Sequence, residues 1–186
     1  MSFDYFIAVQ RNSWPTGEAV QTALGKLGYP LRLVDAPSTP FAVENFRDGL
    51  PVIFEGRKVI LEADTEEAQD ADDSESLFGY IAECAAPNFS IVNGDRFLTL
   101  TFRADADQIR AGLYLAAAMI KSFGGYGFEN QFETHGSLGF ADQLLAEASD
   151  APAFEREEPR PPESISAIVQ PEKSRGFFSA FFGKKD

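Results

Sequence analysis

The sequence is poor in the residues that most often bind metals or form disulfides. It has one cysteine and one histidine among 186 residues. A single cysteine excludes an intramolecular disulfide and suits a reducing compartment, so Cys84 is expected to be a small buried hydrophobic residue. A zinc site needs several cysteine or histidine ligands and is excluded as well. We therefore predict no metal and no cofactor.

Long apolar runs are also missing. The longest, Leu113 to Ile120, is far too short to cross a bilayer, which takes about 20 apolar residues. The first residues, Met1 to Phe6, lack the basic segment of a signal peptide and enter a strand pattern at once. The expected location is therefore the cytoplasm.

Basic residues are few relative to acidic ones. The chain has 16 Lys and Arg residues against 29 Asp and Glu residues, which gives a formal net charge of −13. Such a surface repels nucleic-acid phosphate and anionic lipid, and it attracts basic proteins. We expect a protein partner with a basic surface, and no nucleic-acid partner for the globular part.

Patterns typical of catalytic sites are missing too. His135 comes without a Ser or Cys nucleophile motif, so we expect a histidine in a surface loop. The glycine cluster Gly124 to Gly127 follows a helix and precedes a strand, which is the reverse of a phosphate-binding loop. An EF-hand loop counted from Asp70 would place Glu75 where glycine is required and Ile81 where the bidentate glutamate belongs. We predict no enzyme, although carboxylate-based activity in a cleft between sheet and helices stays open.

What is present is the pattern of a packed α+β domain, with 44% hydrophobic residues and 18 phenylalanines. Strands are predicted over Phe3–Gln10, Leu31–Val34, Leu50–Glu55, Lys58–Glu62, Phe89–Val92, Arg96–Arg103 and Tyr126–Phe132. Gly56-Arg57 and Asn93-Gly94 are predicted to be the turns of two hairpins. Helices are predicted from the cap Thr16 to Gly28, over Ser76–Cys84, from the cap Asp105 to Gly124, and from the cap Ser137 to Ala148.

This order of elements favours an antiparallel or mixed sheet with helices packed on one face. The segments Phe3–Val34 and Arg96–Phe132 each have the order β-α-β, which allows a ferredoxin-like arrangement. We expect the globular domain to cover residues 1–149. A disordered linker rich in Pro and Glu is expected over residues 150–175, and an amphipathic, Phe-rich tip over residues 176–186.

An acidic run separates the fourth strand from the second helix. Glu62 to Glu75 contains eight acidic residues and no basic ones. A solvated, flexible connector is the ordinary explanation of such a run, and a binding surface for a basic partner is the functional one. The predicted partner-binding residues are Glu66, Glu67, Asp70, Asp72, Asp73 and Glu75.

The end of the sequence carries four phenylalanines spaced so that they pair on one side of a short helix. Three destinations remain open for them: a groove of the protein's own domain, a groove of a partner, or weak contact with an anionic membrane surface. The residues predicted to contact a partner or membrane are Phe177, Phe178, Phe181, Phe182, Lys184 and Lys185.

Two stretches resemble small uncharacterised bacterial proteins of the toxin-immunity type. One is the first strand with Trp14-Pro15-Thr16, a helix and Leu27 to Leu33. The other is Asp95 to Arg103, an Ala-rich helix and Gly124-Gly125. The resemblance covers residues 1 to 148 and ends at the proline-rich linker. It implies a binding protein that blocks a cognate toxin, and it transfers no site residues.

Two functions are therefore considered. The first is a non-enzymatic inhibitor of the immunity type that uses its acidic surface to bind a basic protein, such as a toxin. The second is an adaptor or scaffold that is tethered to a partner or a membrane surface through the Phe-rich tip.

Overall fold

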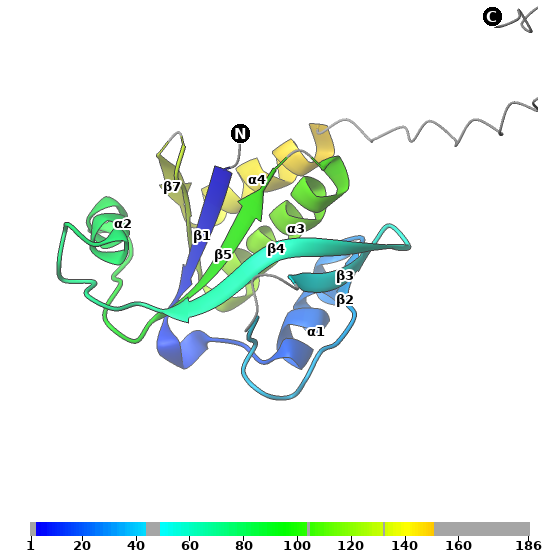
Figure 1. Ribbon diagram of the computed structural model, residues 1–186, viewed down its shortest axis with the longest axis horizontal. Helices are drawn as coiled ribbons and strands as arrows, with labels where there is room; N and C mark the ends of the chain where they lie inside the picture. Colours follow the sequence, from blue (N-terminus) through cyan, green and yellow to red (C-terminus); the bar gives the residue numbers. More distant parts are fainter. Residues whose placement is uncertain (1–2, 44–48, 104, 132, 151–186) are drawn as a thin grey trace, which may run out of the picture. The chain divides into compact units, whose positions relative to one another are not determined.

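Alternating apolar residues build seven strands in the computed structural model, which describes residues 3–43, 49–103, 105–131 and 133–150. The strands are β1 (Phe3–Val9), β2 (Leu31–Leu33), β3 (Leu50–Phe54), β4 (Arg57–Glu67), β5 (Arg96–Phe102), β6 (Tyr126–Glu129) and β7 (Thr134–Gly136). They pair antiparallel in the order β2-β3-β4-β5-β1-β6-β7 (Figure 1). The α+β class with an antiparallel sheet is therefore confirmed.

The helices begin and end where the sequence places their caps. They are α1 (Gly17–Leu27), α2 (Leu77–Ala85), α3 (Ala106–Phe123) and α4 (Leu138–Asp150), with a 3₁₀ turn η1 (Arg11–Ser13) after β1. The side chains of Thr16 and Asp105 accept hydrogen bonds from backbone amides in the first turns of α1 and α3. Gly28 and Gly124 end the same helices in the left-handed conformation, with φ angles of 69° and 67°.

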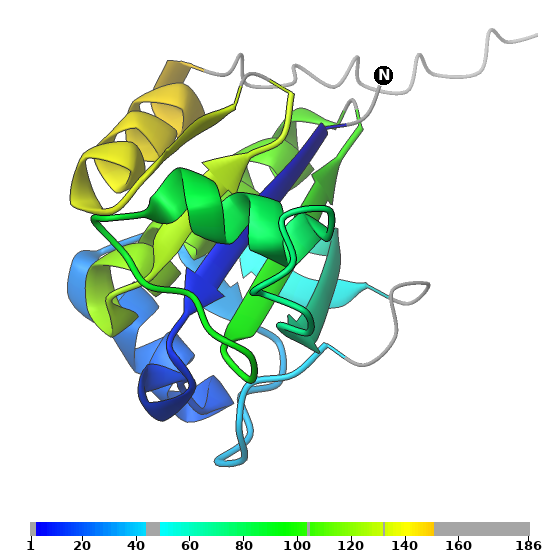
Figure 2. The same cartoon turned by 90° about the vertical axis from the view of Figure 1, so that its left-hand side faces the viewer.

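The two faces of the sheet are covered by different helices. On β1, Tyr5, Ile7 and Val9 belong to the core under α1, α3 and α4, whereas Phe6 and Ala8 belong to a second cluster under α2. Figure 2 shows α2 in front of the strands, on the side away from the other helices. The expectation that all helices pack on one face thus needs correction, because β1 is apolar on both faces and each face requires a cover.

Only half of the ferredoxin-like expectation is realised. β5 and β6 lie on either side of β1 and both run antiparallel to it, so β5, α3 and β6 form a split β-α-β unit. In the other segment with the order β-α-β, which consists of β1, α1 and β2, the two strands are not neighbours, because β3, β4 and β5 all lie between them. The hairpin β3–β4 is inserted there, which separates β2 from β1 by more strands than a ferredoxin-like sheet allows.

Of the two predicted hairpins, the first is confirmed, with its turn one residue earlier than the predicted Gly56-Arg57, and the second is wrong. β3 and β4 pair across a turn at Glu55 and Gly56, whose φ angles of 49° and 79° are both positive, as a tight two-residue hairpin turn requires. Phe89 to Val92 forms no strand, and Asn93 instead accepts a hydrogen bond from the backbone of Ala71 through its side chain. β5 pairs with β1 and β4, which are both longer than the predicted partner segment.

The last expected boundaries fall largely outside the described residues. α4 ends at Asp150, which is the first residue of the predicted linker, and the rest of the linker and the Phe-rich tip lie outside the described residues. The predicted strand from Tyr126 to Phe132 is shorter in the structure and ends at Glu129. The final residue of that prediction, Phe132, is outside the described residues.

A matched pair of glycine substitutions tests the packing of α3 on the sheet. A Cβ atom at Gly112 would lie 2.3 Å from Cε1 of the buried Phe102 ring, whereas a Cβ atom at Gly25 in α1 would meet no atom within 4 Å. We expect Gly112→Ala to lower the free energy of unfolding by about 1–3 kcal/mol. Gly25→Ala should raise it by up to about 1 kcal/mol through helix propensity. Urea unfolding measures both, and stabilisation by both substitutions would contradict this packing.

Candidate functional site

The first part of the acidic run is an ordered strand. β4 continues past its predicted end and stops at Glu67. Leu61 is buried in the core, and because side chains alternate along a strand, Glu62, Asp64 and Glu66 share the opposite face. These three carboxylates form a column along β4, with neighbours about 7 Å apart.

The neighbouring strands extend this column. In the pairing register, Glu62 lies opposite Thr101 of β5, and Thr101 lies opposite Asp4 of β1. The Thr101 hydroxyl donates to Asp4 Oδ1 at 2.6 Å, and the Thr99 hydroxyl donates to Glu66 Oε1 at 3.4 Å. We call this surface, formed by Asp4, Glu62, Asp64 and Glu66, the acidic sheet face.

Negative charge dominates the acidic sheet face. Burial and the nearby Asp64 carboxylate raise the pKa of Glu66, and the hydrogen bond from Thr99 lowers it. Glu62 pairs with Arg103, whose Nε lies 2.8 Å from the carboxylate. The Arg103 side chain is 67% exposed, so this pair stabilises the fold little and leaves the guanidinium free to exchange partners.

The second part of the acidic run is an ordered loop before α2. Asp73 N–H donates to Asp70 O at 3.0 Å, and the Ser76 hydroxyl donates to the same oxygen at 2.7 Å. Glu75 N–H donates to Asp73 Oδ1 at 3.0 Å. The expectation of a flexible connector is therefore wrong for this segment, residues 68–76, which we call the acidic loop. Its bonds fix the backbone while the carboxylates stay in solvent.

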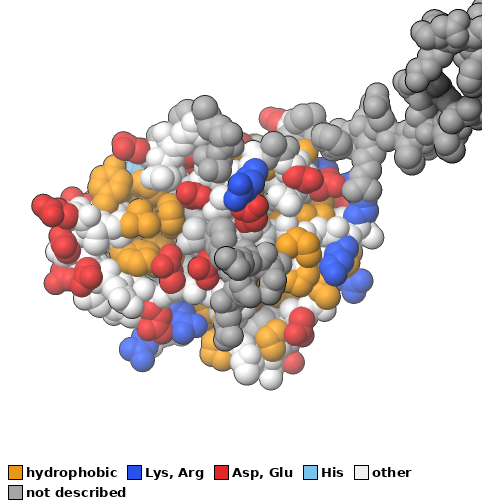
Figure 3. Space-filling view, in the orientation of Figure 1, with side chains coloured by type: hydrophobic (Ala, Val, Ile, Leu, Met, Phe, Trp, Pro, Cys, Tyr) orange, Lys and Arg blue, Asp and Glu red, His pale blue; other side chains and the backbone are white. Residues whose placement is uncertain are grey.

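All six residues of the predicted acidic site are exposed, although neighbouring residues partly shield Glu66 from solvent, and the six do not form one surface. Glu66 belongs to the acidic sheet face, and Glu67 pairs with Arg96 at 3.0 Å. The remaining four, in the acidic loop, are Asp70, Asp72, Asp73 and Glu75. Figure 3 shows carboxylates gathered at the left edge of the molecule, where Figure 1 places the loop before α2.

The prediction did not include Asp4, Glu62 and Asp64 as site residues. For two of them a signal exists, because Leu61 and Ala63 alternate with Glu62 and Asp64 and so predict a strand end with one acidic face. Asp4 has no such signal. It reaches the site through a hydrogen bond to Thr101, 97 residues away in the sequence.

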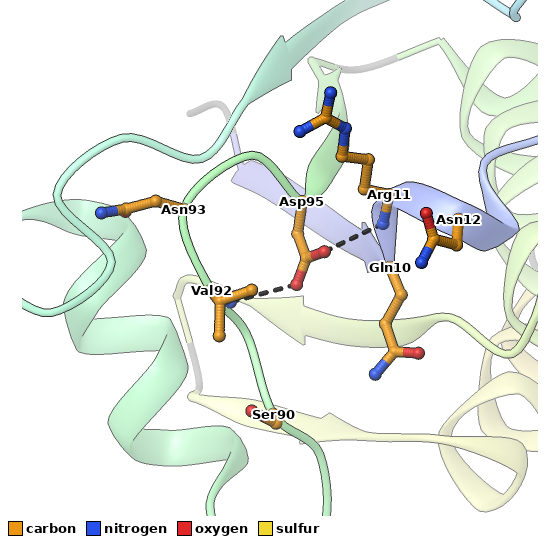
Figure 4. Close-up of a pocket in the computed structure, with 7 residues that line it drawn as sticks. All are labelled: Gln10, Arg11, Asn12, Ser90, Val92, Asn93 and Asp95. Atoms are coloured by element: carbon orange, nitrogen blue, oxygen red, sulfur yellow. Dashed lines mark hydrogen bonds between the residues drawn. The ribbon is translucent and has the colours of Figure 1, made fainter.

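A polar pocket of about 590 Å³ lies where β1 ends (Figure 4). The carboxylate of Asp95, only 5% exposed, accepts hydrogen bonds from the backbone N–H groups of Arg11 and Val92 at 2.9 Å and 3.0 Å. In Figure 4 the side chains of Gln10, Arg11 and Asn93 point in three different directions. Asp95 therefore joins the end of β1 to the loop before β5, and we call this arrangement the junction. The polar groups that line the pocket do not converge on a ligand.

His135 lies in β7, not in a loop as expected. Its Nδ1 shares a hydrogen bond with the Tyr126 hydroxyl at 2.5 Å, and its ring stacks on Phe128. Burial raises the pKa of Tyr126. Cys84, a residue of α2, packs against the cluster that contains Tyr126 and Phe128, but it is only half-buried and not buried as expected. Because Nδ1 of the imidazole is hydrogen-bonded to a phenol, these residues do not present the geometry of a Cys-His dyad.

Among the described residues, His, Cys, Asp and Glu side chains form no group of three or more that could hold a metal ion. None of the described helices has the length and hydrophobicity needed to span a bilayer. The predicted tail residues from Phe177 to Lys185 lie outside the described part of the chain.

No protein-family model matches the chain, and neither a curated protein nor a solved structure matches it significantly. The resemblance to toxin-immunity proteins therefore stays a prediction.

Asp95→Ala is expected to destabilise the protein by about 2–4 kcal/mol, because two backbone donors lose their buried acceptor. Asp95→Asn keeps one acceptor oxygen and should cost less. The exposed Asp72, changed to Ala, is the matched control and should cost little. Urea unfolding of the three variants measures how much each substitution lowers the free energy of unfolding. Equal effects of Asp95→Ala and Asp72→Ala would refute the structural role of the junction.

Glu66→Gln is expected to stabilise the protein near neutral pH. The pKa of Glu66 lies above its ordinary value of 4.5. The folded state thus holds this proton more tightly than the unfolded chain, and ionisation removes stability as the pH rises through the folded pKa. Thermal melts should show that the variant melts at a higher temperature than the unchanged protein at neutral pH, and that this difference disappears below about pH 4. Glu83→Gln, an exposed residue of α2, is the control, and a gain that persists in acid would contradict the argument.

Proposed function

We propose that the protein is a non-enzymatic binding protein that inhibits a basic protein partner, in the manner of an immunity protein. The observation that carries this proposal is the column of Glu62, Asp64 and Glu66 on β4, with Asp4 beside it on the same face. A protein that cleaves or binds nucleic acid lines its cleft with Lys and Arg. A row of fixed carboxylates is complementary to such a cleft.

The energetics of Glu66 support this function. Its raised pKa means that its negative charge is disfavoured in the free protein, through burial and through repulsion by Asp64. A basic side chain placed between the two carboxylates would relieve that repulsion. The sheet holds the carboxylates in place before binding, so little conformational entropy is lost when the partner arrives.

The acidic loop has a different role in this proposal. Asp70, Asp72 and Asp73 are exposed and lie beyond the end of β4. Exposed charges at the rim of an interface mainly raise the association rate, through long-range attraction that salt screens. We therefore assign the acidic sheet face to contact and the acidic loop to steering.

The tethered adaptor remains a prediction, because its anchors lie outside the described residues. A pull-down from native cytosol with the full chain and with a chain truncated after Gln170 distinguishes the two functions. A basic protein retained by both chains supports the inhibitor. A partner that is lost on truncation supports the adaptor and contradicts the inhibitor.

With the retained basic partner in hand, two triple substitutions test the division of roles. Glu62→Gln/Asp64→Asn/Glu66→Gln should weaken binding by about tenfold or more, with faster dissociation, because contacts are lost. Asp70→Asn/Asp72→Asn/Asp73→Asn should mainly slow association at low salt. Surface plasmon resonance at two salt concentrations measures both rates.

The matched control removes the same charge elsewhere. Glu18→Gln/Asp35→Asn/Glu83→Gln alters three exposed residues that lie outside both acidic surfaces. This variant should bind almost as the unchanged protein does. If it weakens binding as much as the substitutions on β4, net charge alone is responsible, and the assignment of the acidic sheet face is wrong.

A further inference from the structure

A second site lies on the other face of the sheet, under the helices. A cleft of about 350 Å³ is lined by residues of β1, β6, α3 and α4. Phe3, Ile109 and Leu113 supply apolar walls. Its volume and mixed lining suit a small organic molecule. We call it the sheet–helix cleft.

Three ionisable side chains line this cleft: Tyr5, Glu129 and Glu147. Glu129 ends β6 directly opposite Tyr5 of β1 and is only 3% exposed. Its Oε1 accepts a hydrogen bond from the Gln131 backbone at 2.8 Å. The Tyr5 hydroxyl donates to Oε2 of Glu147 at 3.3 Å. One strand pairing and one helix thus bring together groups far apart in the sequence.

The charged side chains that line the cleft are all acidic. Its described lining residues include two carboxylates and no Lys, Arg or His. Burial and the carboxylates of Glu147 and Glu129 raise the pKa of Tyr5 far above the neutral range, so the phenol stays protonated. A cleft of one charge sign with low-dielectric walls focuses its potential and concentrates ions of the opposite charge.

We propose that the sheet–helix cleft binds a small organic cation, namely an ammonium or guanidinium group carried on a short apolar body. The cationic group lies between Glu129 and Glu147, and the apolar body packs against Phe3, Ile109 and Leu113. The Tyr5 hydroxyl donates to Oε2 of Glu147 at 3.3 Å and the Gln143 amide donates to Oε1 at 2.9 Å, and these two hydrogen bonds hold the carboxylate at the cleft. Charge-assisted hydrogen bonds then select a cation over a neutral molecule of equal size.

This site is independent of the proposed inhibitor surface. Tyr5 points toward the helices, whereas its neighbour Asp4 points to the opposite face of the sheet. A basic protein and a small cation therefore use separate faces, and failure of one proposal leaves the other intact.

Titration of the full-length, ¹⁵N-labelled protein tests the cleft. The probes are benzylammonium and benzylguanidinium, with benzyl alcohol as the neutral match. We expect the backbone amide signals of β6 and α4 to shift, with dissociation constants in the millimolar range for the cations and at least about tenfold weaker binding of the alcohol. Absence of cation-dependent shifts around the cleft, or equal binding of the alcohol, would overturn the proposal.

Variants locate the binding groups. Glu147 is half-buried near the end of α4, so Glu147→Gln should keep the fold and weaken benzylammonium binding by about tenfold or more. Glu129→Gln should weaken it as strongly, provided that its amide spectrum shows an intact fold. Glu83→Gln removes the same charge from the opposite side of the sheet and should leave the affinity unchanged. Unchanged affinity of the well-folded Glu147→Gln variant would refute the site, whatever the result at Glu129.

Discussion

The backbone hydrogen bonds of β4 are the interaction on which both parts of the sheet depend. Its first residues, Arg57 to Leu61, pair with β3, and its last, Glu62 to Glu67, pair with β5. Because the side chains of one continuous strand alternate, the same register that buries Leu61 places the half-buried Glu62 on the opposite face. A slip of one residue would bring carboxylates into the core. The hydrophobic core and the acidic sheet face are therefore specified by the same register of β4.

The second face of the sheet is divided between two kinds of surface. Phe6 and Phe128 are buried there, in the cluster that also holds the buried residues of α2. On β4 the same face carries carboxylates, and no described helix packs on them. The opposite face is covered by α1, α3 and α4, and its open end forms the sheet–helix cleft. One sheet thus separates a surface suited to a macromolecule from a cleft suited to a small molecule.

Local patterns predicted the helices well, because caps and stops act within a few residues of the chain. Thr16, Asp105, Gly28 and Gly124 all serve as the sequence indicates. The prediction of the second hairpin was wrong because the pairing of β5 is decided by strands that are distant in the sequence. Asn93-Gly94 is a strong local turn signal, but β5 gains longer ladders from distant strands, and the turn joins the acidic loop instead. The cleft could not be predicted at all, since Tyr5 and Glu147 meet from positions 142 residues apart.

The acidic sheet face needs an explanation beyond solubility. Charges dispersed over the surface would keep the protein soluble without placing Asp64 beside Glu66 on one strand, where the Asp64 carboxylate raises the pKa of Glu66. Protection against edge-to-edge aggregation does not require it either. β4 lies between β3 and β5, and the edge strands β2 and β7 are only three residues long, which already limits pairing with other chains. Fixed carboxylates on one sheet face, with Asp64 disfavouring the charge of Glu66, suit a binding surface for cationic side chains, because a cation bound between them removes that repulsion.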